Sequence, residues 1–189
     1  MLNNGLARYG EAFTAARAAC SHLDLGFHGW CLYELVEAAT RSGEDSVARA
    51  AAEKLAVSAG SSGTDWGLGL SAGAQAMLAT DETADDMFTE ALERLSRTPV
   101  VVHLARVRLL YGEWLRRVNR RSDARRELAS ASDVFNRVGA RGFAERAGRE
   151  LAATGDKVRR QQTRTGGELT AQEAQIARLA AEGLTNQEI

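Results

Sequence analysis

The sequence predicts an all-α protein made of stacked antiparallel helical hairpins, followed by a linker and a separate C-terminal segment. Three observations lead to this fold class. The 189-residue chain is rich in alanine and arginine and has a single proline, Pro99, which is a helix-favouring composition. Small residues recur with a period that is typical of stacked helical hairpins. Turn residues divide the chain into segments of helical length.

Four alanines mark the repeat, and each is followed by an apolar residue at the fourth and the seventh position. An alanine lets one helix approach its hairpin partner closely, and the two later residues continue the same helix face. We expect Val36, Ala72 and Gly112, which precede the last three alanines by twelve residues, to be the matching contact points. The four alanines, spaced 36, 36 and 40 residues apart, are Ala12, Ala48, Ala84 and Ala124.

Breaker residues such as Gly43 and Gly139 separate eight expected helices. Pro99 after Thr98 suits the first helical position behind an N-cap. The expected helices span residues 6–20, 27–41, 45–58, 65–79, 83–96, 99–118, 122–138 and 141–153. Helix 99–118 is the longest and most apolar, so we expect it to be central. Its expected buried stripe consists of Val101, Leu104, Ala105, Arg108, Tyr111, Gly112 and Leu115.

The spacing of the small residues resembles the tetratricopeptide family from residue 5 to about residue 138. The tryptophan, tyrosine and proline positions of that family are mostly not kept. The resemblance implies a right-handed stack in which small residues allow a tight contact within each hairpin. We therefore expect residues 1–153 to form a tetratricopeptide-like helical repeat region.

Residues 154–168 differ in composition from the repeat region. They are polar, include three glycines and four cationic side chains, and have no apolar stripe. Such a composition is typical of a flexible linker.

Residues 169–189 contain a helix-start pattern twice. Thr170 precedes Glu173 by three residues and Thr185 precedes Glu188 by three, so each pair can form a capping box. Gly183 suits the position just after a helix. We expect two short helices joined by a tight turn, which is the opening of a helix-turn-helix.

The run L-T-A-Q-E-A-Q-I-A-R-L-A-A-E-G-L-T-N-Q-E-I resembles the start of the LuxR-type DNA-binding domain of bacterial transcription regulators. Upstream, R-V-R-L-L-Y-G-E-W-L-R-R resembles the helical sensor region of the large ATP-dependent, MalT-like group. The resemblance implies that residues 169–189 are an incomplete helix-turn-helix domain and that Thr185, Asn186 and Gln187 contact DNA phosphates. We expect Ile189 to be a truncation point, because it lies within a helix.

Composition and motifs argue against other classes of protein. The formal net charge of −1 gives no overall attraction to nucleic acid. A phosphate-binding loop with its lysine, a G-x-S-x-G elbow and an H-E-x-x-H helix are all absent. We therefore expect neither enzymatic activity nor a cofactor. Without a membrane-length apolar run or a signal peptide, we expect a cytoplasmic protein with no membrane partner.

Two polar clusters have simpler explanations than a binding site. Cys20, His22, His28 and Cys31 lie within twelve residues, but their spacing is not that of known zinc sites. We expect partly buried helix residues there rather than a metal site. A second cluster is expected to be a solvated helix end with its following turn rather than a partner surface. It consists of Arg116, Arg117, Arg120, Arg121, Arg125 and Arg126.

Two functions are compatible with these patterns. In the first, the chain is part of a DNA-binding transcription regulator whose repeats respond to a protein or small-molecule effector. This chain would then bind DNA weakly or not at all, because the base-reading helix of the complete domain would follow Ile189. The alternative is a stand-alone helical-repeat scaffold for protein–protein interactions without DNA binding.

Overall fold

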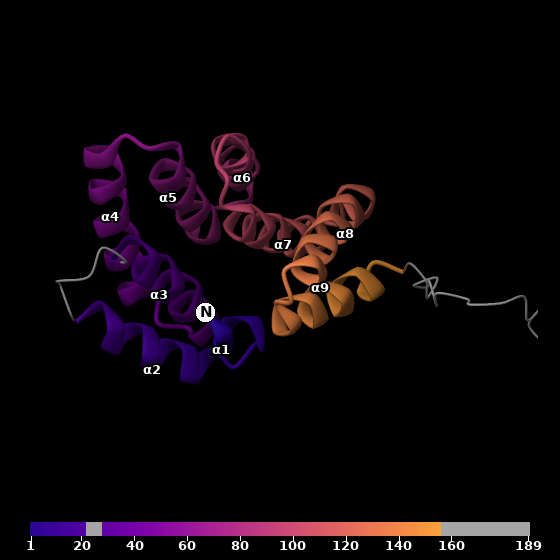
Figure 1. Ribbon diagram of the computed structural model, residues 1–189, viewed down its shortest axis with the longest axis horizontal. Helices are drawn as coiled ribbons and strands as arrows, with labels where there is room; N and C mark the ends of the chain where they lie inside the picture. Colours follow the sequence, from indigo (N-terminus) through magenta and orange to yellow (C-terminus); the bar gives the residue numbers. More distant parts are fainter. Residues whose placement is uncertain (22–27, 156–189) are drawn as a thin grey trace, which may run out of the picture. The chain divides into compact units, whose positions relative to one another are not determined.

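The computed structural model describes residues 1–21 and 28–155. The chain divides into two units, Met1–Asp156 and Lys157–Ile189, and every described helix belongs to the first unit. The described residues form nine helices and no strand, which confirms the all-α fold class (Figure 1). Apart from Thr154 and Gly155, the expected linker and C-terminal segment lie outside the described residues.

Eight helices of twelve or more residues follow one helix of four residues. Sequence neighbours pack against each other from α2 through α9, as expected for stacked hairpins. Within the described ranges, no helix has the length and apolar character needed to cross a membrane. The helices are α1 Leu2–Gly5, α2 Tyr9–Cys20, α3 His28–Ser42, α4 Asp45–Ser62, α5 Asp65–Leu78, α6 Asp81–Ser96, α7 Val101–Arg117, α8 Arg121–Arg137 and α9 Arg141–Ala153.

Most expected helix boundaries agree with the structure within a few residues, but two differ for local reasons. Ala7 has a positive φ of 57°, which breaks the expected helix 6–20 and delays its start to Tyr9. The prediction for Pro99 is wrong, because α7 begins at Val101. The Thr98 hydroxyl donates to the Leu95 carbonyl at 2.9 Å, so Thr98 extends the last turn of α6 instead of capping α7.

The four repeat alanines are buried, which confirms their predicted place at helix contacts. Ala12 is 4% exposed, and Ala48, Ala84 and Ala124 are fully buried. The structure also explains the small residue at position 112. A Cβ atom added to Gly112 would lie 2.6 Å from Leu128 Cγ and 3.4 Å from the Ala124 carbonyl oxygen. Helices α7 and α8 therefore approach each other more closely than a side chain at position 112 would allow.

We expect Gly112→Ala to lower the free energy of unfolding by about 1–2 kcal/mol. Alanine gains roughly 0.5–1 kcal/mol over glycine in a helix interior, but overpacking at this contact costs about 1–3 kcal/mol. Gly148→Ala in α9 is the matched control, because its added Cβ would meet no atom within 4 Å. Gly148→Ala should raise the free energy of unfolding by about 0.5–1 kcal/mol, because alanine has the higher helix propensity. Urea unfolding of both variants measures the difference, and equal stabilisation would contradict the tight contact.

Helix α7 lies among several other helices, in agreement with its predicted central place. It contacts α5, α6, α8 and α9, so more than one of its faces is covered. The predicted stripe is wrong at Val101, which is 44% exposed. It also omitted His103 and Arg106, which are buried despite their polarity. Arg106 therefore needs a partner of opposite charge inside the protein.

The first and last described helices are in contact. Helix α1 touches α2, α3 and α9, and Figure 1 shows α1 next to α9. A Cβ atom added to Gly5 would lie 3.0 Å from the Phe143 ring, and one added to Gly142 would lie 3.4 Å from the Gly5 carbonyl carbon, so α1 packs closely against α9. In a simple repeat array each unit contacts only its neighbours. Here α1 joins the two ends of the stack, and the residues at this junction form the candidate site.

Candidate ligand-binding cleft and buried ionic network

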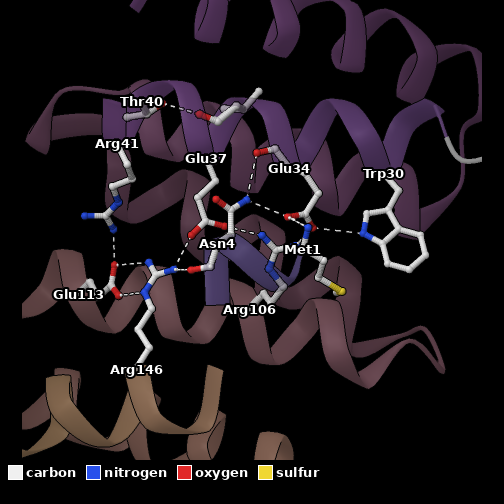
Figure 2. A network of polar contacts seen from close by, with 11 residues as sticks. Met1, Asn4, Trp30, Glu34, Glu37, Thr40, Arg41, Arg106, Glu113 and Arg146 are labelled. Atoms are coloured by element: carbon white, nitrogen blue, oxygen red, sulfur yellow. Dashed lines mark hydrogen bonds and ion pairs between the residues drawn. The ribbon is translucent and has the colours of Figure 1, made fainter. Parts of the chain in front are cut away.

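Charged side chains from three helices meet inside the protein, where α1, α3, α7 and α9 come together (Figure 2). Helix α3 contributes Glu34 and Glu37, α7 contributes Arg106 and Glu113, and α9 contributes Arg146. None of these five side chains is more than 10% exposed. Buried charges are stable only when paired and hydrogen-bonded, and each of these five has at least one partner of opposite charge.

Glu37 lies at the centre of the network. Arg146 Nη1 donates to Glu37 Oε1 at 2.6 Å, and Arg106 Nη2 donates to Glu37 Oε2. Burial by itself raises the pKa of Glu37, but attraction to Arg146 and Arg106 outweighs it and lowers that pKa to about 2. The Glu37 carboxylate is therefore ionised at neutral pH.

Glu34 links α1 to α3 and α7. Its carboxylate pairs with Arg106 and accepts from Asn4 Nδ2 at 2.8 Å and from Trp30 Nε1 at 3.2 Å. The amino group of Met1 lies 3.1 Å from Glu34 Oε2. Burial raises the pKa of Glu34, and the charges of Arg106 and the amino group lower it further than burial raises it.

Glu113 connects the network to the protein surface. Arg146 donates to both of its carboxylate oxygens, through Nε at 2.7 Å and Nη2 at 2.9 Å. Arg41 from α3 donates to the same carboxylate. Both guanidinium groups also lie over the Tyr9 ring, at 5.9 Å for Arg41 and 5.7 Å for Arg146. This set of contacts cross-links α2, α3, α7 and α9.

The surface end of the network lines a cleft of about 520 Å³. Arg41, Glu113 and Arg146 form part of its wall, together with aromatic and aliphatic side chains from α5, α6 and α7. Volumes of this order suit small-molecule ligands. The arginines that line the cleft are Arg41, Arg116, Arg117, Arg146 and Arg149.

Three arginines of the predicted cluster form ion pairs with acidic residues of another helix. Arg116 Nε lies 2.8 Å from Glu150, Arg117 Nη2 lies 3.0 Å from Asp81, and Arg120 Nη1 lies 2.8 Å from Asp85. Exposed pairs of this kind contribute little stability, about 0–1 kcal/mol each. Arg116 and Arg117 also line the cleft.

The cysteine and histidine cluster is only partly described, since His22 lies outside the described residues. Cys20 and Cys31 are free thiols of intermediate burial. Burial, with a smaller contribution from Cys31, raises the pKa of Cys20 to about 11, so this thiol is protonated at neutral pH. In the part of the chain that the structure describes, no group of three or more His, Cys, Asp or Glu residues could hold a metal ion.

His103 is a buried histidine that the sequence did not single out. Trp30, Tyr33 and Trp66 surround it, with ring centroids 5.4, 6.5 and 5.7 Å from its own. Trp66 Nε1 donates to His103 Nδ1 at 3.0 Å, which requires a neutral imidazole with its proton on Nε2. Burial, followed by the charge of Arg106, lowers the pKa of His103 to about 4.

We expect acid to destabilise the protein through His103 first. Between pH 6.5 and 4 the unfolded chain binds a proton at His103 that the folded chain does not bind. The free energy of unfolding therefore falls as pH falls through this window, by about 2–3 kcal/mol in total. Glu37 contributes only below its unfolded pKa of about 4.5, where the folded carboxylate is still ionised.

Urea unfolding at several pH values between about 7 and 4.5 measures this effect. His103→Gln is the comparison variant, because glutamine stays neutral and can still accept from Trp66. The wild-type protein should lose stability over this range, and the variant should lose much less. Parallel pH profiles for the two proteins would show that another group is responsible.

Comparison with known proteins gives no relative for this chain: no protein-family model, curated protein or solved structure matches it. The function is therefore inferred from the sequence motifs and from the geometry of the described residues. The DNA-contacting residues expected from the sequence, Thr185, Asn186 and Gln187, lie outside those residues. The ionic network and the cleft form a second candidate site, which the sequence did not predict.

Proposed function

We propose that this chain is part of a DNA-binding transcription regulator. Its helical repeats are the sensor or interaction region, and residues 169–189 begin the DNA-binding domain. The two capping-box patterns and the dense resemblance of residues 169–189 to the LuxR type support the second half of this proposal. The cleft between α3, α7 and α9 supports the first half.

The sensor proposal rests on the position of the cleft, whose wall is built from several helices. Arg41, Glu113 and Arg146 belong to three different helices, yet they share one set of hydrogen bonds that reaches the cleft wall. A ligand in the cleft would touch several helices at once. If the ligand binds one arrangement of the helices more tightly than another, it shifts the population toward the arrangement that it binds more tightly. A binding role of this kind requires no catalytic group and no cofactor.

In the DNA-binding half, Thr185, Asn186 and Gln187 lie at the start of the second expected helix. Helix-end amides and side-chain donors at such a position suit a phosphate. Phosphate contacts fix register without reading sequence, and base readout would belong to a helix beyond Ile189. These three residues would therefore contribute affinity for DNA and no sequence specificity.

We expect the 189-residue chain to bind duplex DNA at most weakly and without sequence preference. Titration against two unrelated duplexes at about 50 and 200 mM salt should give equal affinities that fall with salt. The chain ending at Gly155 is the control, and it should bind more weakly still or not at all. Strong preference of the 189-residue chain for one duplex would contradict the assignment of base readout to a later helix. The scaffold alternative predicts that the two chains behave alike.

A further inference from the structure

The cleft collects positive charge in a protein whose formal net charge is −1. Five arginines line it, against two acidic lining residues, Glu113 and Glu150. Glu37 and Asp81 pair with Arg146 and Arg117 from outside the lining, so the surplus is one cation. An arginine guanidinium presents two parallel N–H donors that match the oxygens of a carboxylate or a phosphate. A surplus of arginines around one cleft therefore favours an oxyanion over a neutral or cationic ligand.

The inner wall of the cleft is fixed and already neutralised. Arg146 is held by Glu37 and by both oxygens of Glu113, and its side chain is only 4% exposed. Arg41 shares the Glu113 carboxylate from the other side, as Figure 2 shows. These groups need not reorganise when a ligand arrives, so the wall is preorganised.

The outer arginines are available to a ligand. Arg117 is 66% exposed, and its partner Asp81 is 62% exposed, so water already weakens this pair. Arg149 is exposed, and within the described residues its side chain has no ion pair or hydrogen bond. These two side chains come from α7 and α9 and line the same cleft. They are the groups that an incoming anion would meet.

Apart from Tyr9 and Thr40, the uncharged part of the wall is apolar. Ala76 and Met77 from α5, and Leu110 and Trp114 from α7, line the cleft beside the arginines. Trp114 is held in place by a hydrogen bond of 2.9 Å from its Nε1 to Asp81. An apolar wall next to a cationic edge fits a molecule that has an apolar body and an anionic head.

We propose that the cleft binds a small organic oxyanion, a carboxylate or a phosphate monoester attached to an apolar group. Arg117 and Arg149 bind the anionic head, and the apolar body lies against Met77, Leu110 and Trp114. If the repeats are the sensor region proposed above, this anion is the signal they sense, and its role as a signal rests on the proposed function. The binding itself does not depend on it.

Three naphthalene probes of similar size test the binding, namely naphthyl phosphate, naphthoate and the neutral naphthalenemethanol. Calorimetric titration of the 189-residue chain should show at least one anion binding about tenfold or more tightly than the alcohol. The tighter of the two anions identifies the head group. The indole N–H signal of Trp114 should shift in proton–nitrogen spectra when the anion binds. Equal binding of all three probes, or no binding at about 5 mM, would overturn the proposal.

Charge reversal locates the site. Arg117→Glu with Arg149→Glu should weaken anion binding about tenfold or more. The matched control is Arg17→Glu with Arg137→Glu, which makes the same change in net charge at exposed arginines outside the cleft. It should leave the affinity within about twofold. Equal weakening by both double variants would mean that net charge, and not the cleft, binds the probe.

Both double variants should unfold like the wild type, because surface arginines contribute little to stability. None of these measurements involves DNA, so their failure and a failure of the DNA titration are separate results.

Discussion

Glu37→Gln is expected to lower the free energy of unfolding by about 3–5 kcal/mol, the loss that follows when one partner of a buried ionic network is removed. Glu37 is 1% exposed and accepts from two arginines that are themselves buried. Glutamine keeps the shape of the side chain but removes its charge. Arg106 would retain Glu34 and Arg146 would retain Glu113, but each of these buried arginines would lose its charge-assisted pairing with Glu37.

The control for this variant is Glu53→Gln, which makes the same chemical change at an exposed position on α4. Its effect should stay within about 0.5 kcal/mol, as is usual for surface substitutions. Urea unfolding followed by circular dichroism measures both variants. A loss of less than about 1 kcal/mol for Glu37→Gln would mean that water reaches the network or that the helices relax around it.

Ala48→Arg is expected to destabilise the protein by about 3 kcal/mol or more, through overpacking and burial of an unpaired charge. Ala48 is fully buried in α4 and occupies the same repeat position as Ala84 and Ala124. A long cationic side chain at this position would have to leave water and enter a close helix contact. The same change at Ala84 or Ala124 should have a comparable effect.

The matched control lies two residues away on the same helix. Ala50 is exposed, so Ala50→Arg tests the helix propensity and the charge of arginine without the burial. Thermal unfolding of the two variants separates the cost of burial from the effects of propensity and charge. Ala50→Arg should change the melting temperature little. Similar shifts for both variants would contradict the assignment of Ala48 to a helix contact.

The repeat could be predicted because it depends on residues close in sequence. The alanine at the first position and the apolar residues four and seven positions later lie on one face of one helix, and the hairpin partner follows within a short turn. Glycines also marked the turns: Gly43, Gly63 and Gly139 adopt the positive φ that terminates a helix. Local chemistry of this kind is visible in a single sequence.

The ionic network could not be predicted because its members are far apart in the chain. Arg146 is 109 residues from Glu37 and 142 residues from Asn4. The periodicity of α7 places Arg106 between apolar residues, but it does not say which helix covers that side. Helix α3 covers it, through Glu34 and Glu37, which lie 72 and 69 residues before Arg106, and no short-range pattern encodes that contact. A charged residue within an apolar helix is the one signal that could have been used.

The cleft was missed for a related reason. Arg116 and Arg117 follow an apolar helix and precede a turn, so sequence alone favours a solvated helix end. Both do lie near the surface, but α9 places Arg149 and Glu150 opposite them, and α3 adds Arg41. A concave basic site arises only when these three helices are assembled.

The most direct test of the proposed function is an unbiased selection from random duplex DNA, carried out with the full-length product of the gene that encodes this sequence. We expect one operator sequence to be enriched, with two related half-sites if the protein binds as a dimer. The 189-residue chain should enrich none. Failure of the full-length product to enrich any sequence would contradict the regulator proposal and favour a helical-repeat scaffold that does not bind DNA.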